Sequence, residues 1–387
     1  MNFRILKQNA TQYGMFVALM AVMIFFTITT GGIFMTPRNL SNLFDQTGYV
    51  AVLAIGMTLI LIIRQIDLSV GFAAGFIGAI AALVMRNFPG IPVIFIVIGA
   101  MLIGLCIGFY QGTLVSKFGV PAFVVTLAGM FIFRGALLRV TEGTGTIIVK
   151  KEVFNALGNG FIPDIFGEGG IHVLTVVLGL LLIVYLLVSA VLNRKKRAKY
   201  QLQDLPLDMF IYKLIFISAL ILFFSWKIAN YNGLSWTVVI VIAVLGVYHF
   251  FTNNTVLGRH IYAVGGNPEA AELSGISVQK ITTLVFCSMG TLAGLAGILF
   301  TARLQSATTT AGNAFEMDAI ASCYVGGVSA SGGVGRVTGT IIGALVMSAL
   351  SNGMNLMNIG ISYQYMVRGT VLILAVLFDV RARRMKV

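Results

Sequence analysis

Charged side chains are scarce in this sequence. Asp, Glu, Lys and Arg together make up 10% of the 387 residues, whereas a soluble domain carries about 25%. Hydrophobic residues make up 58%, and the mean hydropathy is +0.95. No stretch is long and polar enough to form a separate soluble domain. The composition therefore excludes a soluble globular protein and predicts a polytopic membrane protein.

Residues that perform catalysis or bind metals are also few. The cysteines Cys106, Cys287 and Cys323 have no C-x-x-C spacing, and the three histidines are scattered, so we expect packing cysteines and no metal site. The sequence has no G-x-x-x-x-G-K-[ST] loop for ATP phosphates, and no G-x-S-x-G, H-E-x-x-H or paired-carboxylate pattern. We therefore expect this chain to have no catalytic residue and to bind no cofactor.

The net charge of +13 does not indicate a nucleic-acid partner. No basic stripe interleaved with aromatic residues is present, and Lys and Arg lie in short loops between apolar runs, where they set membrane orientation. If the N-terminus is inside, the basic segments Arg194–Lys199 and Arg381–Lys386 both fall on the cytoplasmic side, as the positive-inside rule requires. We therefore expect both termini in the cytoplasm.

Apolar runs follow one another along the whole chain, and the pattern predicts an all-α polytopic membrane protein. We expect about 10–12 transmembrane or partly spanning helices, because several runs are short and ten full spans with re-entrant pieces are the alternative. The runs cover residues 14–34, 47–63, 70–85, 91–115, 122–139, 171–193, 209–229, 234–252, 281–302, 317–330, 337–357 and 365–380.

Two polar, glycine-containing breaks interrupt these runs. The first is Arg64–Gly71, where Arg64 and Asp67 could pair if the turn is helical, and the second is Gly326–Arg336. Both are typical of the discontinuous helices that transporters place at binding sites, or equally of tight turns at the membrane surface. Small residues four apart predict close helix packing. These pairs are Gly75 with Ala79, Gly104 with Gly108, Gly290 with Gly294, and Gly339 with Gly343.

Residues 257–278 form a polar segment between two apolar runs. Asn267 is a good N-cap, Pro268 suits the first helical position, and Gly275 is placed to stop a helix. We therefore predict a short helix, Pro268–Ser274, on the cytoplasmic side. Its small side chains would let another protein's surface approach, although an ordinary loop helix is the alternative. On the opposite side, the long loop at about 141–170 carries Glu152 and Asp164, which contact a soluble partner or are simply solvated.

Four segments resemble the permease subunits of bacterial ABC importers for monosaccharides, within the wider branched-chain amino acid and sugar permease family. They are IDLSVG (Ile66–Gly71), PAFVVTLAGMFIFRG (Pro121–Gly135), GRHIYAVGGNPEAAELSGISV (Gly258–Val278) and MDAIASCYVGGVSASGGVGRVTGTIIGA (Met317–Ala344). Short, ribose-like members have one span where this chain has three apolar runs. The extra helix pair, within about 171–252, resembles the xylose-type and multiple-monosaccharide group.

The resemblance implies a single transmembrane permease domain, 1–387, in the bacterial cell membrane, surrounded by lipid. It implies a second permease copy as a homodimer, an extracytoplasmic sugar-binding protein, and a cytoplasmic ATP-binding subunit that holds ATP and Mg²⁺. It also implies a cytoplasmic coupling segment at about 255–280. The residues expected to dock on the ATPase are Gly266, Asn267, Pro268, Glu269, Ala270, Ala271, Glu272, Leu273, Ser274 and Gly275.

A neutral, hydroxyl-rich sugar needs hydrogen-bonding groups along its pathway. The candidates are Asp67, Ser69, Gln111, Thr126, Asn352 and Asn355. Two other classes of function stay open. A self-contained secondary transporter or channel for a small polar solute would need ion-coupling acids in the membrane, and the sequence has almost none there. A membrane enzyme acting on lipid would need clustered His or acids at one interface, and none are evident.

Overall fold

The computed structural model describes residues 10–167, 170–200 and 206–384. It is almost entirely helical. In chain order the elements are α2 (Ala10–Thr29), η1 (Ile33–Met35), α3 (Pro37–Ile62), α4 (Val70–Asn87), α5 (Val93–Ser116), α6 (Ala122–Thr141), β1 (Thr146–Ile148), α7 (Glu152–Asn159), α8 (Val173–Lys199), α9 (Leu207–Ala229), α10 (Trp236–Asn254), α11 (Val256–Gly266), α12 (Pro268–Leu273), α13 (Val278–Leu304), β2 (Ser306–Thr308), α14 (Phe315–Val325), α15 (Val337–Leu356) and α16 (Ile361–Arg384).

Ten helices in the described part of the chain are long and apolar enough to cross a membrane. The predicted all-α membrane fold is confirmed, and two of the twelve predicted runs fall short of that criterion. Helix α2 carries a shorter apolar stretch, Gly14–Thr29. The run at 317–330 forms the 11-residue α14, which ends at Val325 because the glycines that follow do not continue a helix. The lower end of the expected range, ten spans with shorter pieces, therefore describes the fold.

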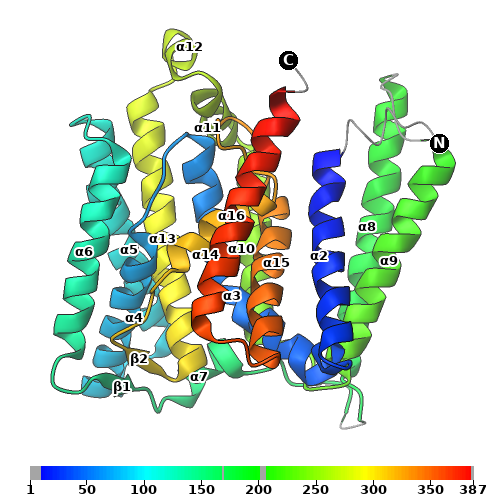
Figure 1. Ribbon diagram of the computed structural model, residues 1–387, viewed down its shortest axis with the longest axis horizontal. Helices are drawn as coiled ribbons and strands as arrows, with labels where there is room; N and C mark the ends of the chain where they lie inside the picture. The colour runs from blue at the N-terminus through cyan, green and yellow to red at the C-terminus, as the bar shows by residue number, and fades with distance from the viewer. Residues whose placement is uncertain (1–9, 168–169, 201–205, 385–387) are drawn as a thin grey trace. The chain divides into compact units, whose positions relative to one another are not determined.

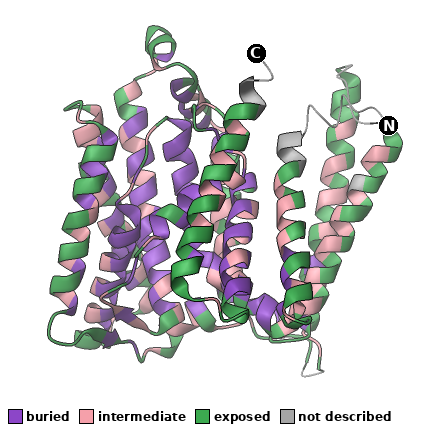
Figure 2. Ribbon diagram, in the orientation of Figure 1, coloured by how far each residue is buried: buried purple, intermediate pink, exposed green. Residues whose placement is uncertain are grey.

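The chain divides into two compact units. The first unit comprises residues 1–34, 43–160 and 236–387, and the second comprises residues 35–42 and 161–235. In the first unit, buried residues gather on α3, α4, α13 and α15, whereas α6 and α16 are mostly exposed (Figure 2). Exposed apolar helices fit a protein that lipid surrounds. The buried helices hold the polar breaks discussed below.

Glycines allow the central helices of the first unit to touch through their backbones. A Cβ atom on Gly104 of α5 would lie 2.0 Å from the Gly290 carbonyl oxygen of α13, and one on Gly290 would lie 2.1 Å from the Gly104 oxygen. Similarly, a Cβ on Gly343 of α15 would lie 1.9 Å from the Ser322 oxygen of α14. The sequence prediction of close packing at these glycines is confirmed, because any side chain there would force the helices apart.

The second unit contains the apolar pair α8 and α9, which lie side by side (Figure 1). Gly179 of α8 faces Ser225 of α9 so closely that a Cβ on the glycine would lie 2.3 Å from the serine Oγ. Basic residues Lys196, Arg197 and Lys199 occupy the last turn of α8, where cations interact favourably with the helix dipole.

The two ends of the first unit differ in structure. Helices α11 and α12 lie at one end, whereas the β1–β2 ribbon and α7 lie at the other (Figure 1). The ribbon is antiparallel, with Ile147 opposite Ala307. The distribution of Lys and Arg along the sequence predicts that the end with α12 faces the cytoplasm.

Candidate functional site

Helix α12 forms where the sequence predicts it and ends one residue earlier. Asn267 Oδ1 accepts a hydrogen bond from the Ala270 N–H at 3.1 Å, and Pro268 occupies the first turn. Gly275 has a φ of +82°, in the left-handed region that a glycine adopts without strain. The caps thus fix both ends of a helix that is too short to be stable alone.

One face of α12 packs on its own protein, and the other is free. The Ala271 side chain is only 4% exposed and belongs to the core of the first unit, so the expectation that Ala271 offers a small outer surface to a partner is wrong. Glu269, Ala270 and Glu272 are exposed. Leu273 is 91% exposed. Sequence reasoning included Leu273 in the segment but missed that it is the projecting apolar group, because the position of Ala271 was not known.

Four of the six candidate pathway residues lie at the first break, where Asp67, Ser69 and Gln111 form one hydrogen-bonded network and Thr126 bonds to the adjacent backbone. Asp67 Oδ1 accepts from the Ser69 N–H at 2.9 Å and from the Ser69 hydroxyl at 2.7 Å. Gln111 of α5 donates to the Ser69 Oγ at 2.9 Å, and Thr126 of α6 donates to the Ile66 carbonyl at 3.3 Å. These contacts give hydrogen-bond partners to irregular backbone that is buried or partly buried among packed helices. All four of these side chains are buried, so in this conformation none of them is open to solvent.

The other two candidates lie elsewhere. Asn352 and Asn355 are in the last part of α15. Asn355 Oδ1 accepts from Gln364 Nε2 in the first turn of α16 at 2.7 Å, and Asn352 is buried. The structure therefore separates the six residues into a group at the first break and a group at the far end of α15. Their role in a pathway stays a prediction.

Arg64 does not pair with Asp67, contrary to the possibility raised by their spacing. The residue has a φ of +61°, which ends α3 and turns the side chain away from Asp67. Its guanidinium instead donates to the Gly265 carbonyl at 2.8 Å and to the Gly266 carbonyl. The first break is thus bonded to the residues that immediately precede α12.

Sequence reasoning missed a buried charged cluster on α14 and α16. Asp318 of α14 accepts from Arg368 of α16 at 3.0 and 3.3 Å. Glu316, two residues earlier and 6% exposed, has a buried Oε2 with no hydrogen-bond partner. The signal was available, since two acids stand two residues apart at the start of an apolar run. A membrane acid is a functional candidate by default because its burial is costly.

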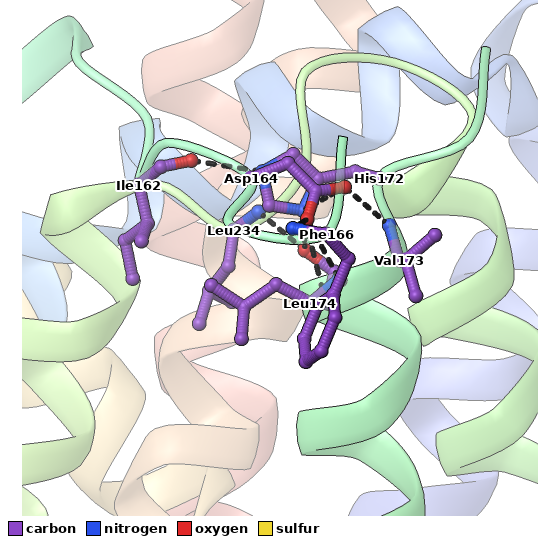
Figure 3. A network of polar contacts seen from close by, with 8 residues as sticks. Ile162, Asp164, Phe166, His172, Val173, Leu174 and Leu234 are labelled. Carbon is purple, nitrogen blue, oxygen red and sulfur yellow. Dashed lines mark hydrogen bonds and ion pairs between the residues drawn. The ribbon is translucent and has the colours of Figure 1, made fainter. Parts of the chain in front are cut away.

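A polar network organises the start of α8 in the second unit (Figure 3). Asp164 accepts from the N–H groups of Val173 at 2.6 Å, Phe166 at 3.1 Å and Leu174 at 3.3 Å. The Asp164 side chain is 13% exposed. It therefore caps α8, and the expectation that this carboxylate is free to contact a soluble partner or solvent is not supported. Glu152 of α7 is exposed, as expected.

His172 completes this network. Because a carbonyl oxygen only accepts, the contact between His172 Nε2 and the Ile162 oxygen at 2.8 Å makes Nε2 the donor. His172 Nδ1 then accepts from the Thr175 N–H at 3.3 Å and from its hydroxyl at 3.0 Å. The Leu234 N–H donates to the Thr175 Oγ1 at 2.9 Å. The network thus joins the start of α8 to the chain that follows α9 (Figure 3).

We expect the start of α8 to loosen in acid. Partial burial acts to raise the pKa of Asp164, but the three N–H donors and His172 outweigh it and hold this pKa below its usual range. The stabilisation from these contacts is therefore fully present above the usual Asp pKa of about 3.9 and is lost as the pH falls through the lower folded-state pKa.

Hydrogen-exchange protection of the Val173 and Leu174 amides should fall as the pH is lowered from the usual Asp pKa through the folded-state pKa of Asp164. Asp164→Ala should lower it at neutral pH, whereas Glu152→Gln should not. Protection that persists in the alanine variant would contradict this assignment.

The model of the family described as branched-chain amino acid transport system / permease component matches residues 39–376. The xylose transport system permease protein of Haemophilus influenzae is 37% identical over 97% of this chain and 98% of its own length. The protein of that name from Escherichia coli K12 is 36% identical over 97% and 93%. The ribose import permease protein of Escherichia coli K12 is 35% identical over 89% and 87%. No solved structure matches.

Together the fold and the comparisons define the class of protein. The ten apolar helices found among the described residues make the chain a multi-pass membrane protein. It belongs to the branched-chain amino acid transport system permease family, which the sequence motifs predicted.

Proposed function

We propose that this chain is the membrane-spanning subunit of an ATP-driven importer that translocates a monosaccharide, xylose or a similar sugar. The observation that carries the proposal is the full-length similarity to the xylose transport system permease proteins, at 36–37% identity over 97% of the chain. Similarity to the ribose import permease covers 89% of the chain. This difference favours the xylose-type group, in which α8 and α9 would be the added helix pair.

The transporter would need partners. The sequence has no phosphate-binding loop, so ATP and Mg²⁺ would be bound by a separate cytoplasmic ATP-binding subunit. A sugar-binding protein would deliver the substrate from the other side of the bacterial inner membrane. We infer a second copy of this chain as the other half of the pathway, one permease domain per chain, and both termini in the cytoplasm. The charge asymmetry of the loops supports this orientation.

Helix α12 is the element we assign to contact with the ATPase. Its inner face is anchored through Ala271, and its outer face presents Leu273 together with Glu269 and Glu272. Glu269 and Glu272 are three residues apart, so they lie on one face and can meet basic groups. An apolar group projecting from a short helix is suited to a groove, in the manner of helix-in-groove recognition. ATP-driven movement of that groove would then move α12 and change which side the pathway opens to.

We expect Leu273→Ser to reduce ATP-dependent sugar uptake. Removing a central apolar anchor costs about 2 kcal/mol or more in binding, which corresponds to roughly thirtyfold in affinity. The measurement is uptake of labelled xylose, with a panel of other monosaccharides, into proteoliposomes that contain the purified chain, its ATPase and its binding protein. Co-purification of the ATPase should fall in parallel.

Leu304→Ser is the matched control. Leu304 is also an exposed leucine, at the end of α13 next to the β1–β2 ribbon, so it lies far from α12 within the first unit. Sugar uptake by the wild-type chain without any ATPase would contradict the importer and favour a secondary transporter or channel. Full uptake and full ATPase binding by Leu273→Ser would contradict the assignment of α12.

A further inference from the structure

Three segments far apart in the sequence meet directly before α12. We call them the Arg64 junction: the end of α3 (Ile62–Arg64), the end of α11 (Tyr262–Gly266), and the loop between α14 and α15 (Ser329–Gly335). Arg64 donates to the Gly265 carbonyl at 2.8 Å and to the Gly266 carbonyl. These carbonyls end α11, so the guanidinium is a cation at the negative end of a helix dipole.

The glycine loop closes the junction from the other side. The Gly333 N–H donates to the Ile62 carbonyl at 2.9 Å, and the Tyr262 hydroxyl donates to the Gly335 carbonyl at 2.7 Å. Gly332 packs against the apolar stem of Arg64, because a Cβ on Gly332 would lie 2.3 Å from Arg64 Cγ. Each of the three segments is therefore bonded to another through its backbone.

The three segments lie too close together to slide past one another. A Cβ on Gly265 would lie 1.9 Å from the Ile62 carbonyl oxygen and 2.8 Å from the Gly333 nitrogen. Gly332 and Gly333 both have positive φ values, +75° and +68°, which fixes the loop in a shape that other residues rarely adopt. Small displacements at such an interface are transmitted as movements of whole segments.

The junction links the residues before α12 to both polar breaks, because Arg64 begins the first break and Ser329–Gly335 lies within the second. On one side, Gly266 is followed at once by Asn267, the N-cap of α12. On the other side, Arg64 is followed by the Asp67 network and α4. The glycine loop connects α14, which carries Glu316 and Asp318, to α15. The residues before α12 are thus connected to these helices by the Arg64 guanidinium, the Tyr262 hydroxyl and the Gly333–Ile62 backbone hydrogen bond.

We propose that Arg64 is the positioning residue that transmits movement of α12 to the helices that flank the two polar breaks, α3 with α4 and α14 with α15. It does so by holding the Gly265 and Gly266 carbonyls to the end of α3. This inference rests on the proposed function, since it takes α12 as the ATPase-contacting helix. Arg64 touches neither sugar nor nucleotide. Its contribution is to couple the position of α12 to the position of the Asp67 network.

The test uses Arg64→Met and Arg64→Lys in the complete transporter. Met keeps the apolar stem that packs on Gly332 and removes every donor. Lys keeps the charge but lacks the planar fork that binds two carbonyls at once. We expect Arg64→Met to lower the number of sugars imported per ATP hydrolysed by about tenfold, within the usual range of coupling between sites. Arg64→Lys should restore part of that loss, and basal ATPase activity should persist.

A second measurement separates positioning from folding. A spin label at Glu272 reports the mobility of α12, and it should become more mobile in Arg64→Met with the melting temperature of the complex nearly unchanged. Arg381→Gln, which removes one exposed basic charge from α16, is the control and should change neither quantity. An unchanged sugar-to-ATP ratio and unchanged label mobility in Arg64→Met would overturn the inference. Absence of ATP-dependent uptake in the wild-type complex would instead overturn the proposed function.

Discussion

Gly104→Ala should destabilise the protein by about 3 kcal/mol, at the upper end of the cost of overpacking a core. The added methyl group would lie 2.0 Å from the Gly290 carbonyl oxygen and 3.2 Å from the Gly294 nitrogen. Those atoms belong to the backbone of α13, so no side chain can rotate to make room. The two helices must separate, and the loss of packing extends along their interface. The melting temperature of the purified chain in detergent measures the effect.

Gly99→Ala is the matched control because it lies on the same helix, α5. A Cβ on Gly99 meets no atom within 4 Å, so the substitution should be neutral or should stabilise the helix by up to about 1 kcal/mol. Both variants replace a glycine of α5 with alanine. Gly104→Ala should lower the melting temperature, whereas Gly99→Ala should leave it unchanged or raise it. Equal melting temperatures would show that the packing of α5 on α13 does not depend on the close backbone contact at Gly104.

The sequence predicted the fold class because membrane spans have a strong compositional signal. Twenty apolar residues with few charges identify a span without any knowledge of its neighbours. The signal fails for α14, which has 11 residues and is held by its neighbours. Packing glycines were also predictable, because their spacing is local and their chemistry is specific.

The short helix at Pro268 was predicted to within one residue for the same reason: caps are local. What the sequence did not contain was the direction in which α12 faces. Ala271 and Leu273 are two residues apart, and either could have pointed to the protein or to solvent. Only the packing of α12 on the first unit decides that Leu273 is the exposed residue.

Long-range polar contacts were predicted least well. The pairing of Arg64 with the Gly265 and Gly266 carbonyls spans 201 and 202 residues, whereas sequence spacing suggested only the local partner Asp67. Asp318 and Arg368 are 50 residues apart. No periodicity within one helix indicates which residue of another helix it will meet, so both contacts became visible only in the folded chain.

Breaking the Asp318–Arg368 pair should have a larger effect than any surface substitution. Arg368→Met removes both contacts, at 3.0 and 3.3 Å, and leaves the Asp318 carboxylate buried in α14. Removing one partner of a buried ion pair costs about 3–5 kcal/mol, because the remaining charge is uncompensated. We therefore expect a marked fall in the melting temperature of the purified chain, at neutral pH in detergent.

The double variant Asp318→Asn with Arg368→Met distinguishes an unpaired charge from lost packing. If the cost comes from the unpaired carboxylate, removing that charge should recover most of the stability, since a buried pair replaced by uncharged groups of similar volume is often nearly neutral. With the single variant Asp318→Asn measured as well, the cost of the double variant minus the summed costs of the two single variants is the coupling free energy between the two sites. Arg139→Met supplies the exposed comparison: Arg139 pairs with Glu142 at the surface, where an ion pair contributes about 0–1 kcal/mol. Equal losses in Arg368→Met and Arg139→Met would show that Asp318 does not depend on Arg368.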